Sequence, residues 1–588
     1  MNEFSMRREY AWRSTFVSWL LPFLALAILG QIAYLQNRPE SKVFRDQAEI
    51  FARIPVTFYP ERGDIYDRNG HLLAGNETIY TVGVDIPSMV NADALGREVS
   101  SKLGLDYEKT YNKLLNPYGL VFVPLKNYVT SDELAPLKES FEKMDDEAEA
   151  HYQSSPLSGL EFQANLQRTY PENELASNII GFFNHDLLGS FGVEEKYNDL
   201  LAGLPVIAWV PQDPNRAAEI PKVPDGTTLI LTIDRDLQAA AESSLDQALS
   251  DYGANNGTII IMDPRTGEIL AMATTPRLNL NEFWDYGNVF ANESYGYNPA
   301  ISMQYEPGSV FKVLTMAAGL DSGTVVPDTI FNDTGSIVVG DVLIQNWDRR
   351  PWGPQDMTGC LQHSLNVCLA WISSSMGQDT FYDYMQRFGL GRPTGIDLAG
   401  ETIGRLKVPG DADWYPVDLG TNAFGQGVAV SPIQMITAAS AIANNGRMVT
   451  PHVLYAMVGE GRQSNIQMQP AGTPIRAETA HTLSEMLANS LENEASMALV
   501  PGYRVAGKTG TAEIPINGYY NSDATNVSFV GWGPVDDPQF MIYIWLDRPS
   551  TSIWANDTAA PLFSEIAQKT VILLDIPPDA VRLQTENQ

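Results

Sequence analysis

Residues 306–312 read Glu-Pro-Gly-Ser-Val-Phe-Lys, and residues 313–320 continue as Val-Leu-Thr-Met-Ala-Ala-Gly-Leu. This order predicts the start of a buried helix, because Pro307 suits the last non-helical or the first helical position and the residues after it are too apolar for a solvated surface. Ser309 and Lys312 are three residues apart and share a helix face, so the lysine amine can reach the serine hydroxyl. A nucleophile beside its base has this arrangement.

Lys312 can act as a base only if its amine is unprotonated, and a free lysine amine has a pKa of about 10.4. Removing the proton at pH 7 costs about 4.6 kcal/mol, from roughly 3.4 pK units at about 1.36 kcal/mol each. Burial and a second nearby cation both lower the pKa of a lysine. We therefore expect another positive group near Lys312.

The Ser-x-x-Lys pattern alone is a weak signal, because Ser140 and Lys143 also match it. That second match lies in a segment rich in lysine and glutamate, which predicts a solvated helix. The assignment of Ser309 therefore depends on other motifs farther along the chain.

Two such motifs follow. Residues 364–366 read Ser-Leu-Asn on a predicted helix, and residues 508–511 read Lys-Thr-Gly-Thr on a predicted strand. With Ser309 and Lys312, the chain resembles the penicillin-binding proteins and serine β-lactamases, which carry Ser-x-x-Lys, Ser-x-Asn and Lys-Thr-Gly in this order. The resemblance implies acyl transfer through Ser309. We expect no cofactor, and the six histidines without a His-Glu-x-x-His pattern give no indication of zinc.

The resemblance also implies roles for the strand motif. Lys508 supplies the second cation and, with the hydroxyls of Thr509 and Thr511, faces the terminal carboxylate of the substrate, while Gly510 completes this substrate-binding motif. The backbone N–H groups of Ser309 and Thr511 are expected to form the oxyanion hole. Each such donor is worth roughly 3 to 4 kcal/mol in comparable acyl transfers.

In the helical motif, the resemblance implies that Ser364 passes protons between Lys312 and the leaving amine, and that Asn366 holds the substrate amide. A Ser-His pair made by His363 and Ser364 is an alternative. We disfavour it, because neighbours in sequence point to different helix faces.

Length and charge set the broad class of protein. The chain has 588 residues, which corresponds to three or four domain-sized units. Its formal net charge of −33 argues against nucleic-acid binding, because no basic cluster offsets the repulsion from phosphates.

Residues 16–35 form an almost uncharged apolar run, long enough to cross a bilayer as one helix. We expect a tail at 1–15 and a membrane span at 16–36. A cleaved signal peptide is the alternative, but the run is long and no small-x-small site follows it. Arginines lie on both sides of the run, so charge alone does not fix its orientation.

The C-terminal part reads as a sheet with helices added. After a strand and helix at 229–249, hairpin-like strands are predicted at 258–262, 268–273, 505–507, 527–532 and 540–546. Five strands joined largely by hairpins predict an antiparallel sheet and an α+β fold, which fits the penicillin-binding and serine β-lactamase-like transpeptidase domain.

The segment between the apolar run and this sheet contains Arg-Gly at 62–63 before an Asn-Gly turn, then Arg168 and the segment 192–197. These residues resemble the pedestal motifs of class B penicillin-binding proteins. We expect a mixed α/β pedestal at 37–225, used for dimerisation or partner binding, and a transpeptidase domain at 226–588. The Pro-rich stretch 210–224 predicts a linker or edge hairpin between them.

Cys360 and Cys368 are the two cysteines of the chain. If both lie on one helix, eight residues separate them by about 12 Å, which is too far for a bond. We therefore expect two packed, reduced thiols.

The first hypothesis is a membrane-anchored, extracytoplasmic D,D-transpeptidase that cross-links peptidoglycan stem peptides and is inhibited by β-lactams. Its resemblance implies a SEDS-type membrane glycosyltransferase as partner, in elongation or division. The alternatives are a non-catalytic scaffold of the wall-synthesis complex and a membrane-anchored β-lactamase or β-lactam sensor.

Glu401 decides between a transpeptidase and a β-lactamase, because a positioned carboxylate can activate water against the ester. Its surroundings lack the pattern of class A β-lactamases, so we expect a capped, solvated loop there. The glycine-rich run 422–427 lacks a following Lys-Ser or Lys-Thr, which disfavours a phosphate cradle and favours a turn before a helix at 433–443.

Overall fold

A computed structural model of the chain describes residues 3–38, 41–43, 53–211, 223–291, 296–516 and 519–585. By its contacts the chain forms two compact units. The first comprises Met1–Pro60 and Gly203–Pro224, and the second comprises Glu61–Ala202 and Asp225–Gln588.

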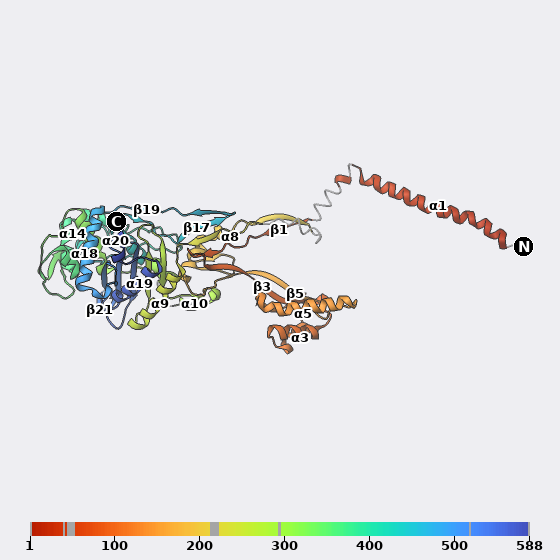
Figure 1. Cartoon of the computed structure of the whole chain (residues 1–588), viewed down its shortest axis with the longest axis horizontal. Coiled ribbons are helices and arrows are strands. Elements are labelled where there is room, and N and C mark those ends of the chain that lie inside the picture. Colours follow the sequence, from red (N-terminus) through yellow and green to blue (C-terminus); the bar gives the residue numbers. More distant parts are fainter. Residues whose placement is uncertain are drawn as a thin grey trace. The chain divides into compact units, whose positions relative to one another are not determined.

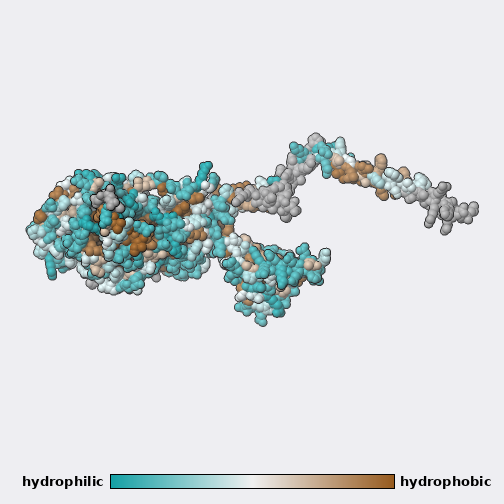
Figure 2. Space-filling model, viewed as in Figure 1, coloured by the Kyte–Doolittle hydropathy of each residue, from teal (hydrophilic) through white to brown (hydrophobic). Residues whose placement is uncertain are grey.

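The first unit contains the helix α1 (Glu3–Gln36) and a two-stranded antiparallel ribbon of β1 (Arg53–Phe58) and β8 (Val206–Pro211). Thr15–Gln36 within α1 is long and apolar enough to cross a membrane, and none of it is buried. Figure 2 shows brown, hydrophobic residues along part of this stretch. The expected apolar helix is thus confirmed, whereas residues 212–222 of the Pro-rich stretch lie outside the described residues.

The sheet that carries the Lys-Thr-Gly motif lies in the second unit and has five strands in the order β11-β10-β22-β21-β20. All four pairings are antiparallel, which confirms the α+β expectation. The strands are β10 (Gly257–Met262), β11 (Ile269–Thr274), β20 (Ala506–Ile516), β21 (Tyr519–Gly533) and β22 (Phe540–Asp547).

Helices cover both faces of this sheet, because alternate side chains of each strand point to opposite faces. Ile259 and Ile261 pack with α9 (Arg235–Tyr252) and α19 (Ala559–Leu573) in one buried cluster. Ile260 belongs to the other buried cluster. That second cluster includes residues of α12 (Lys312–Asp321), α14 (Asn366–Met376), α17 (Pro432–Ala443) and α18 (Ala477–Glu494).

A second sheet joins the N-terminal segment to the C-terminal part. Its strand order is β18-β17-β9-β2-β3-β4, with β5 also paired to β3. The strands are β2 (Ile65–Tyr66), β3 (Leu72–Asp85), β4 (Phe122–Val129), β5 (Leu160–Thr169), β9 (Thr228–Leu231), β17 (Leu454–Gly459) and β18 (Arg462–Asn465). The predicted strand at residue 229 therefore pairs with β2 and β17 and belongs to this sheet.

In Figure 1, β3 and β5 extend as an arm that ends in the helices α3 (Ala92–Leu103) and α5 (Ser131–Ala150). Within α5, Ser140 donates to Glu98 at 2.6 Å and Lys143 is exposed. The second Ser-x-x-Lys match is therefore on a solvated helix, as expected.

A buried ion cluster holds the base of this arm. The Glu194 carboxylate on α7 (Gly192–Lys196) is completely buried and accepts from Arg62 Nε at 2.7 Å and from Arg168 Nε at 2.8 Å. Arg168 also donates to the Gly63 carbonyl at 2.9 Å, and the Tyr170 hydroxyl lies 3.4 Å from Glu194. Two cations and one anion without solvent are stable only while all of these contacts persist.

The expectation of free thiols was wrong, because Cys360 and Cys368 form a disulfide with 6.1 Å between their Cα atoms. The two residues do not share one helix. Cys360 lies on α13 (Met357–Gln362), Cys368 lies on α14, and the chain reverses between them at Ser364, whose φ is 52°.

We expect this disulfide to be detectable and stabilising. Closing a loop of nine residues lowers the entropy of the unfolded chain and contributes about 2 to 3 kcal/mol. Alkylation of the native protein without reductant should leave both cysteines unmodified in intact mass spectra. Reductant should destabilise the wild type but not the variant Cys360→Ala/Cys368→Ala, and two alkylated cysteines in unreduced native protein would contradict the bond.

Candidate active site

Ser309 lies in a single 3-10 turn, η4 (Gly308–Phe311), that leads directly into α12. The predicted helix start is confirmed, although the first turn is tighter than an α-helix. Val310 and Phe311, the two middle residues of the Ser-x-x-Lys motif, are completely buried, whereas Ser309 is partly exposed. The hydroxyl is therefore held on a rigid turn at the edge of the core.

Glycines allow three backbone segments to meet at this turn. A Cβ on Gly308, whose φ is 57°, would lie 2.7 Å from the carbonyl oxygen of Thr511 on β20. A Cβ on Gly510 would lie 2.8 Å from Val310, and one on Gly425 would lie 2.2 Å from the Gly308 oxygen. Side chains at Gly308 or Gly510 would push the strand motif away from the nucleophile turn, and one at Gly425 would push the 422–427 run away from it.

Lys312 is completely buried, and its Nζ atom faces α14. It donates to the carbonyl of Ser364 at 2.6 Å and to Asn366 Oδ1 at 2.8 Å, and it lies 3.1 Å from Ser364 Oγ. Among the described residues, the structure gives no hydrogen bond between Lys312 and Ser309. Such contacts are often long before substrate binds.

These three partners accommodate an ammonium, which would donate to all three oxygens, and they also accommodate an unprotonated amine. A neutral amine has two N–H donors for the Ser364 and Asn366 carbonyl oxygens, and one lone pair that can accept from the Ser364 hydroxyl. Burial lowers the pKa of Lys312 well below its usual value, and the charge of Lys508 lowers it further. The second cation expected from the sequence is therefore present near the base.

Lys508 lies on β20 and is 4% exposed. Burial lowers its pKa to about 8, partly offset by the nearby carboxylate of Glu494. Its Nζ atom lies 3.3 Å from both the carbonyl and the hydroxyl of Thr509, so its contacts are weak. The Thr511 hydroxyl accepts from the Ala555 N–H at 3.2 Å.

The structure thus brings together all three sequence motifs, with Ser309, Lys312, Ser364, Asn366 and the 508–511 strand around one site. The family described as "Penicillin binding protein transpeptidase domain" matches residues 257–568, and the "Penicillin-binding Protein dimerisation domain" matches residues 57–215. The chain belongs to the penicillin-binding protein family.

Relatives agree over most of the length of the chain. "Stage V sporulation protein D" of Bacillus subtilis is 31% identical over 91% of this chain and 81% of the relative. "Probable peptidoglycan D,D-transpeptidase PbpC" of Pseudomonas aeruginosa is 28% identical over 98% of this chain and 97% of the relative. These matches extend the family assignment from the transpeptidase domain to nearly the whole chain.

Solved structures of the family have the same fold. Penicillin-binding protein 3 of Mycobacterium tuberculosis, complexed with aztreonam, matches with a TM-score of 0.68 and 26% identity over 89% of this chain and 98% of that one. Penicillin-binding protein 2X of Streptococcus thermophilus matches with a TM-score of 0.75 and 24% identity over 88% of this chain and 80% of that one, which supports the fold alone.

Two other predictions about single residues can be compared with the structure of this penicillin-binding protein. The Nδ1 atom of His363 lies 2.8 Å from Glu494 and its ring stacks on Trp352, so this histidine is engaged away from the Ser364 hydroxyl. Both carboxylate oxygens of Glu401 accept from residues of its own loop, Thr394 and Gly395. The capped loop expected at Glu401 is confirmed.

Sequence reasoning missed a link between two motifs of the site. Trp347 donates its indole N–H to the carbonyl of His363 at 3.2 Å, beside the Ser-x-Asn motif. Its ring packs against Trp554 at 5.4 Å between centroids, and the next residue, Ala555, bonds Thr511. No pattern at either tryptophan indicates this contact, because 207 residues separate them.

The glycine-rich run 422–427 also has a role that the sequence did not reveal. It forms the expected turn before α17, but it also packs against the nucleophile turn. Gly308 N–H donates to Gly425 O at 3.0 Å, and Gly427 N–H donates to Glu306 at 3.0 Å. The available sequence signal was the pair of glycines at 425 and 427, both of which have positive φ in the structure.

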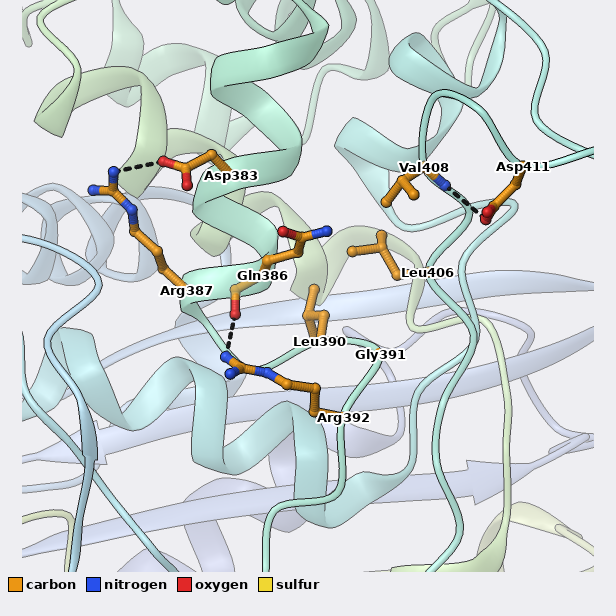
Figure 3. Close-up of a pocket in the computed structure, with 9 residues that line it drawn as sticks. All are labelled: Asp383, Gln386, Arg387, Leu390, Gly391, Arg392, Leu406, Val408 and Asp411. Carbon is orange, nitrogen blue, oxygen red and sulfur yellow. Dashed lines mark hydrogen bonds and ion pairs between the residues drawn. The ribbon is translucent and has the colours of Figure 1, made fainter.

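A pocket of about 560 Å³ lies apart from this site, beside the C-terminal end of α15 (Gln378–Arg387) (Figure 3). None of the motif residues lines it. Its charged side chains are engaged locally, because Arg387 pairs with Asp383 and Asp411 accepts from the Val408 N–H. We assign it no role in the chemistry.

Proposed function

We propose that the chain is a serine D,D-transpeptidase that cross-links peptidoglycan stem peptides and is acylated by β-lactams. The observation that carries this proposal is the buried amine of Lys312, held between Ser364 and Asn366 beside the Ser309 turn. A nucleophile, a neutral base and a nearby cation are the groups that acyl transfer to serine requires.

In the acylation step, Ser309 Oγ attacks the carbonyl between the two terminal D-alanines, and Lys312 takes the hydroxyl proton. The backbone N–H groups of Ser309 and Thr511 stabilise the oxyanion, each worth roughly 3 to 4 kcal/mol. Ser364 passes a proton from the Lys312 ammonium to the leaving amine. The amine of a second stem peptide then attacks the ester, and the same groups act in reverse.

The remaining motif residues hold the substrate. The Lys508 ammonium and the hydroxyls of Thr509 and Thr511 face the terminal carboxylate, and Gly510 lets β20 approach the substrate backbone. Asn366 holds the amide of the donor peptide. The burial of Lys508 and the close approach of β20 to η4 at Gly308 support these roles.

We further propose the domain scheme and the setting of the enzyme. Residues 37–225 act as a pedestal and residues 226–588 as the transpeptidase domain, anchored by the helix at 16–36 with the catalytic domain outside the cytoplasm. A SEDS-type membrane glycosyltransferase supplies the glycan strands. The apolar stretch Thr15–Gln36 and the dimerisation-domain match at residues 57–215 support this setting.

Labelling of the full-length protein in detergent with a fluorescent penicillin tests the proposal. We expect an adduct whose mass maps to Ser309, no labelling of Ser309→Ala, and normal labelling of Ser140→Ala, the matched control in the second Ser-x-x-Lys motif. We expect the adduct to persist, because the Glu401 carboxylate is held by its own loop. Rapid release of hydrolysed penicillin, abolished in Glu401→Gln, would instead make the protein a β-lactamase.

A further inference from the structure

The helix α14 begins at Asn366 of the Ser-x-Asn motif, and its first turn has no cap from its own sequence. The N-cap position is held by Leu365, whose apolar side chain cannot accept a hydrogen bond. Ser364, just before it, has a φ of 52°, which costs energy in a residue other than glycine unless the surroundings hold it. The backbone at this motif therefore needs support from another segment of the chain.

Asn346 supplies this support from the loop after β14 (Val342–Gln345). Its Oδ1 atom accepts from the backbone N–H of Val367, in the first turn of α14, at 3.1 Å. An asparagine oxygen is among the preferred caps of a first turn. Asn346 is 2% exposed, so water does not compete for the bond. Asn346 thus caps α14 although it lies 21 residues before Val367 in the chain.

The amide of Asn346 is oriented by Asp333, the last residue of β12 (Phe331–Asp333). Asn346 Nδ2 donates to Asp333 Oδ2 at 2.8 Å, and the same oxygen accepts from the Trp352 N–H at 2.8 Å. Asp333 is 1% exposed. Because an ionised carboxylate only accepts hydrogen bonds, it holds the nitrogen of Asn346 on its own side and leaves the amide oxygen for α14.

The residue before Asn346 also contacts the motif. The Gln345 carbonyl accepts from Asn366 Nδ2 at 3.2 Å. Because Gln345 takes the nitrogen of Asn366, the oxygen of Asn366 faces Lys312, which donates to it at 2.8 Å. The segment after β14 therefore sets which atom of Asn366 meets the base.

We propose that Asn346, oriented by Asp333, is a positioning residue for acyl transfer, which holds the start of α14 so that Ser364 and Asn366 stay in contact with Lys312. The inference rests on the proposed function, in which Ser364 passes a proton from Lys312 to the leaving amine. Asn346 and Asp333 act only through the motif. A displacement of about 1 Å at a positioned group can cost on the order of 100-fold in rate, so loss of this cap should slow acylation in molecules that remain folded.

Asp333 is the one carboxylate bonded to Asn346 among the described residues. Asp348, farther along the loop, accepts from the backbone N–H of Arg350 at 3.1 Å. Arg350 meets Asn346 with its backbone carbonyl, which accepts from Nδ2 at 3.3 Å. The nearby imidazole of His363 is stacked on a tryptophan ring. A charge introduced at position 346 therefore acts first on Asp333.

The test is the second-order rate constant for acylation of the full-length protein in detergent by a fluorescent penicillin, measured between about pH 5 and pH 8. Asn346→Ala removes the cap and should acylate about tenfold to a hundredfold more slowly than the wild type at every pH. The control Asp234→Ala removes the cap of α9, which packs on the other face of the five-stranded sheet, and should acylate at the wild-type rate. Rate constants come from the time course, so unfolded molecules lower its amplitude and leave the rate constant unchanged.

Asn346→Asp gives a signature that a residue needed only for folding would not give. Its new carboxyl group meets the Asp333 carboxylate, and like charges at this distance do not both ionise, so the pair shares a proton as the pH falls. The protonated group donates to Asp333 and accepts from the Val367 N–H, as the amide does. Measured against the wild type at each pH, acylation of Asn346→Asp should recover as the pH falls and decline as it rises, whereas Asn346→Ala should not recover.

The outcomes separate the two proposals. A wild-type rate constant in Asn346→Ala, an equal loss in Asp234→Ala, or a rate in Asn346→Asp that is equally low at every pH would overturn the positioning role while leaving labelling at Ser309 intact. Labelling that persists in Ser309→Ala would overturn the proposed function instead. If Asn346→Ala yields no folded protein, the pH dependence of Asn346→Asp decides alone.

Discussion

Lys312→Met should lower the second-order rate constant for penicillin acylation by about three orders of magnitude, within the range for loss of a general base. Methionine fills the same buried volume with an apolar chain, so the core around α12 stays packed. The variant cannot take the Ser309 proton. It also loses the contacts to Ser364 and Asn366 that hold α14 against α12.

The same substitution should change how stability depends on pH. The pKa of Lys312 is lower in the folded protein than in the unfolded chain, so the unfolded chain binds more protons below about pH 10.4. The wild type therefore gains stability as the pH rises from the folded pKa of Lys312 towards that value. Lys312→Met should lose this part of the slope in urea unfolding measured at several pH values.

Lys143→Met is the matched control, because Lys143 has the same spacing from Ser140 but is exposed on α5. It should acylate at the wild-type rate and keep the wild-type slope of stability with pH. Acylation of Lys312→Met within tenfold of the wild type would show that another group takes the proton.

The three motifs could be predicted from the sequence because each is short and local. The helix start at Ser309 and the strand at residues 508–511 follow from their own residues, and the antiparallel sheet follows from hairpins between neighbouring strands. Their convergence on one site was supplied by the resemblance to a family. Periodicity alone does not bring Ser309 and Lys508 together.

The errors and omissions arise where distant segments or unusual backbone angles decide the structure. Cys360 and Cys368 were placed on one helix, because nothing local predicts that Ser364, a residue other than glycine, has a φ of 52°. The sequence does not show that the strand at residue 229 pairs with β2, because β2 lies about 160 residues earlier in the chain. The contact between His363 and Glu494 spans 131 residues and has no sequence signal.

Glu194→Ala should lower the free energy of unfolding by about 3 to 5 kcal/mol, because it leaves the buried guanidinium groups of Arg62 and Arg168 without their anion. Both arginine side chains are at most 6% exposed, so water cannot replace the carboxylate without opening the structure. Urea unfolding measures the loss. Limited proteolysis should show earlier cleavage of the segment before residue 203.

Glu195→Ala is the control on the same helix, since Glu195 is exposed and, within the part of the chain that the structure describes, accepts from the backbone N–H of Phe191 alone. The substitution should lower the free energy of unfolding by less than about 1 kcal/mol.

The ion cluster is separate from the active site. Among the described residues, no hydrogen bond or ion pair joins the cluster of Arg62, Arg168 and Glu194 to the catalytic residues Ser309, Lys312, Ser364 and Lys508. The folded fraction of Glu194→Ala should therefore still be acylated by penicillin at close to the wild-type rate. A loss of acylation as large as that of Lys312→Met in demonstrably folded protein would mean that the ion cluster also maintains the active site.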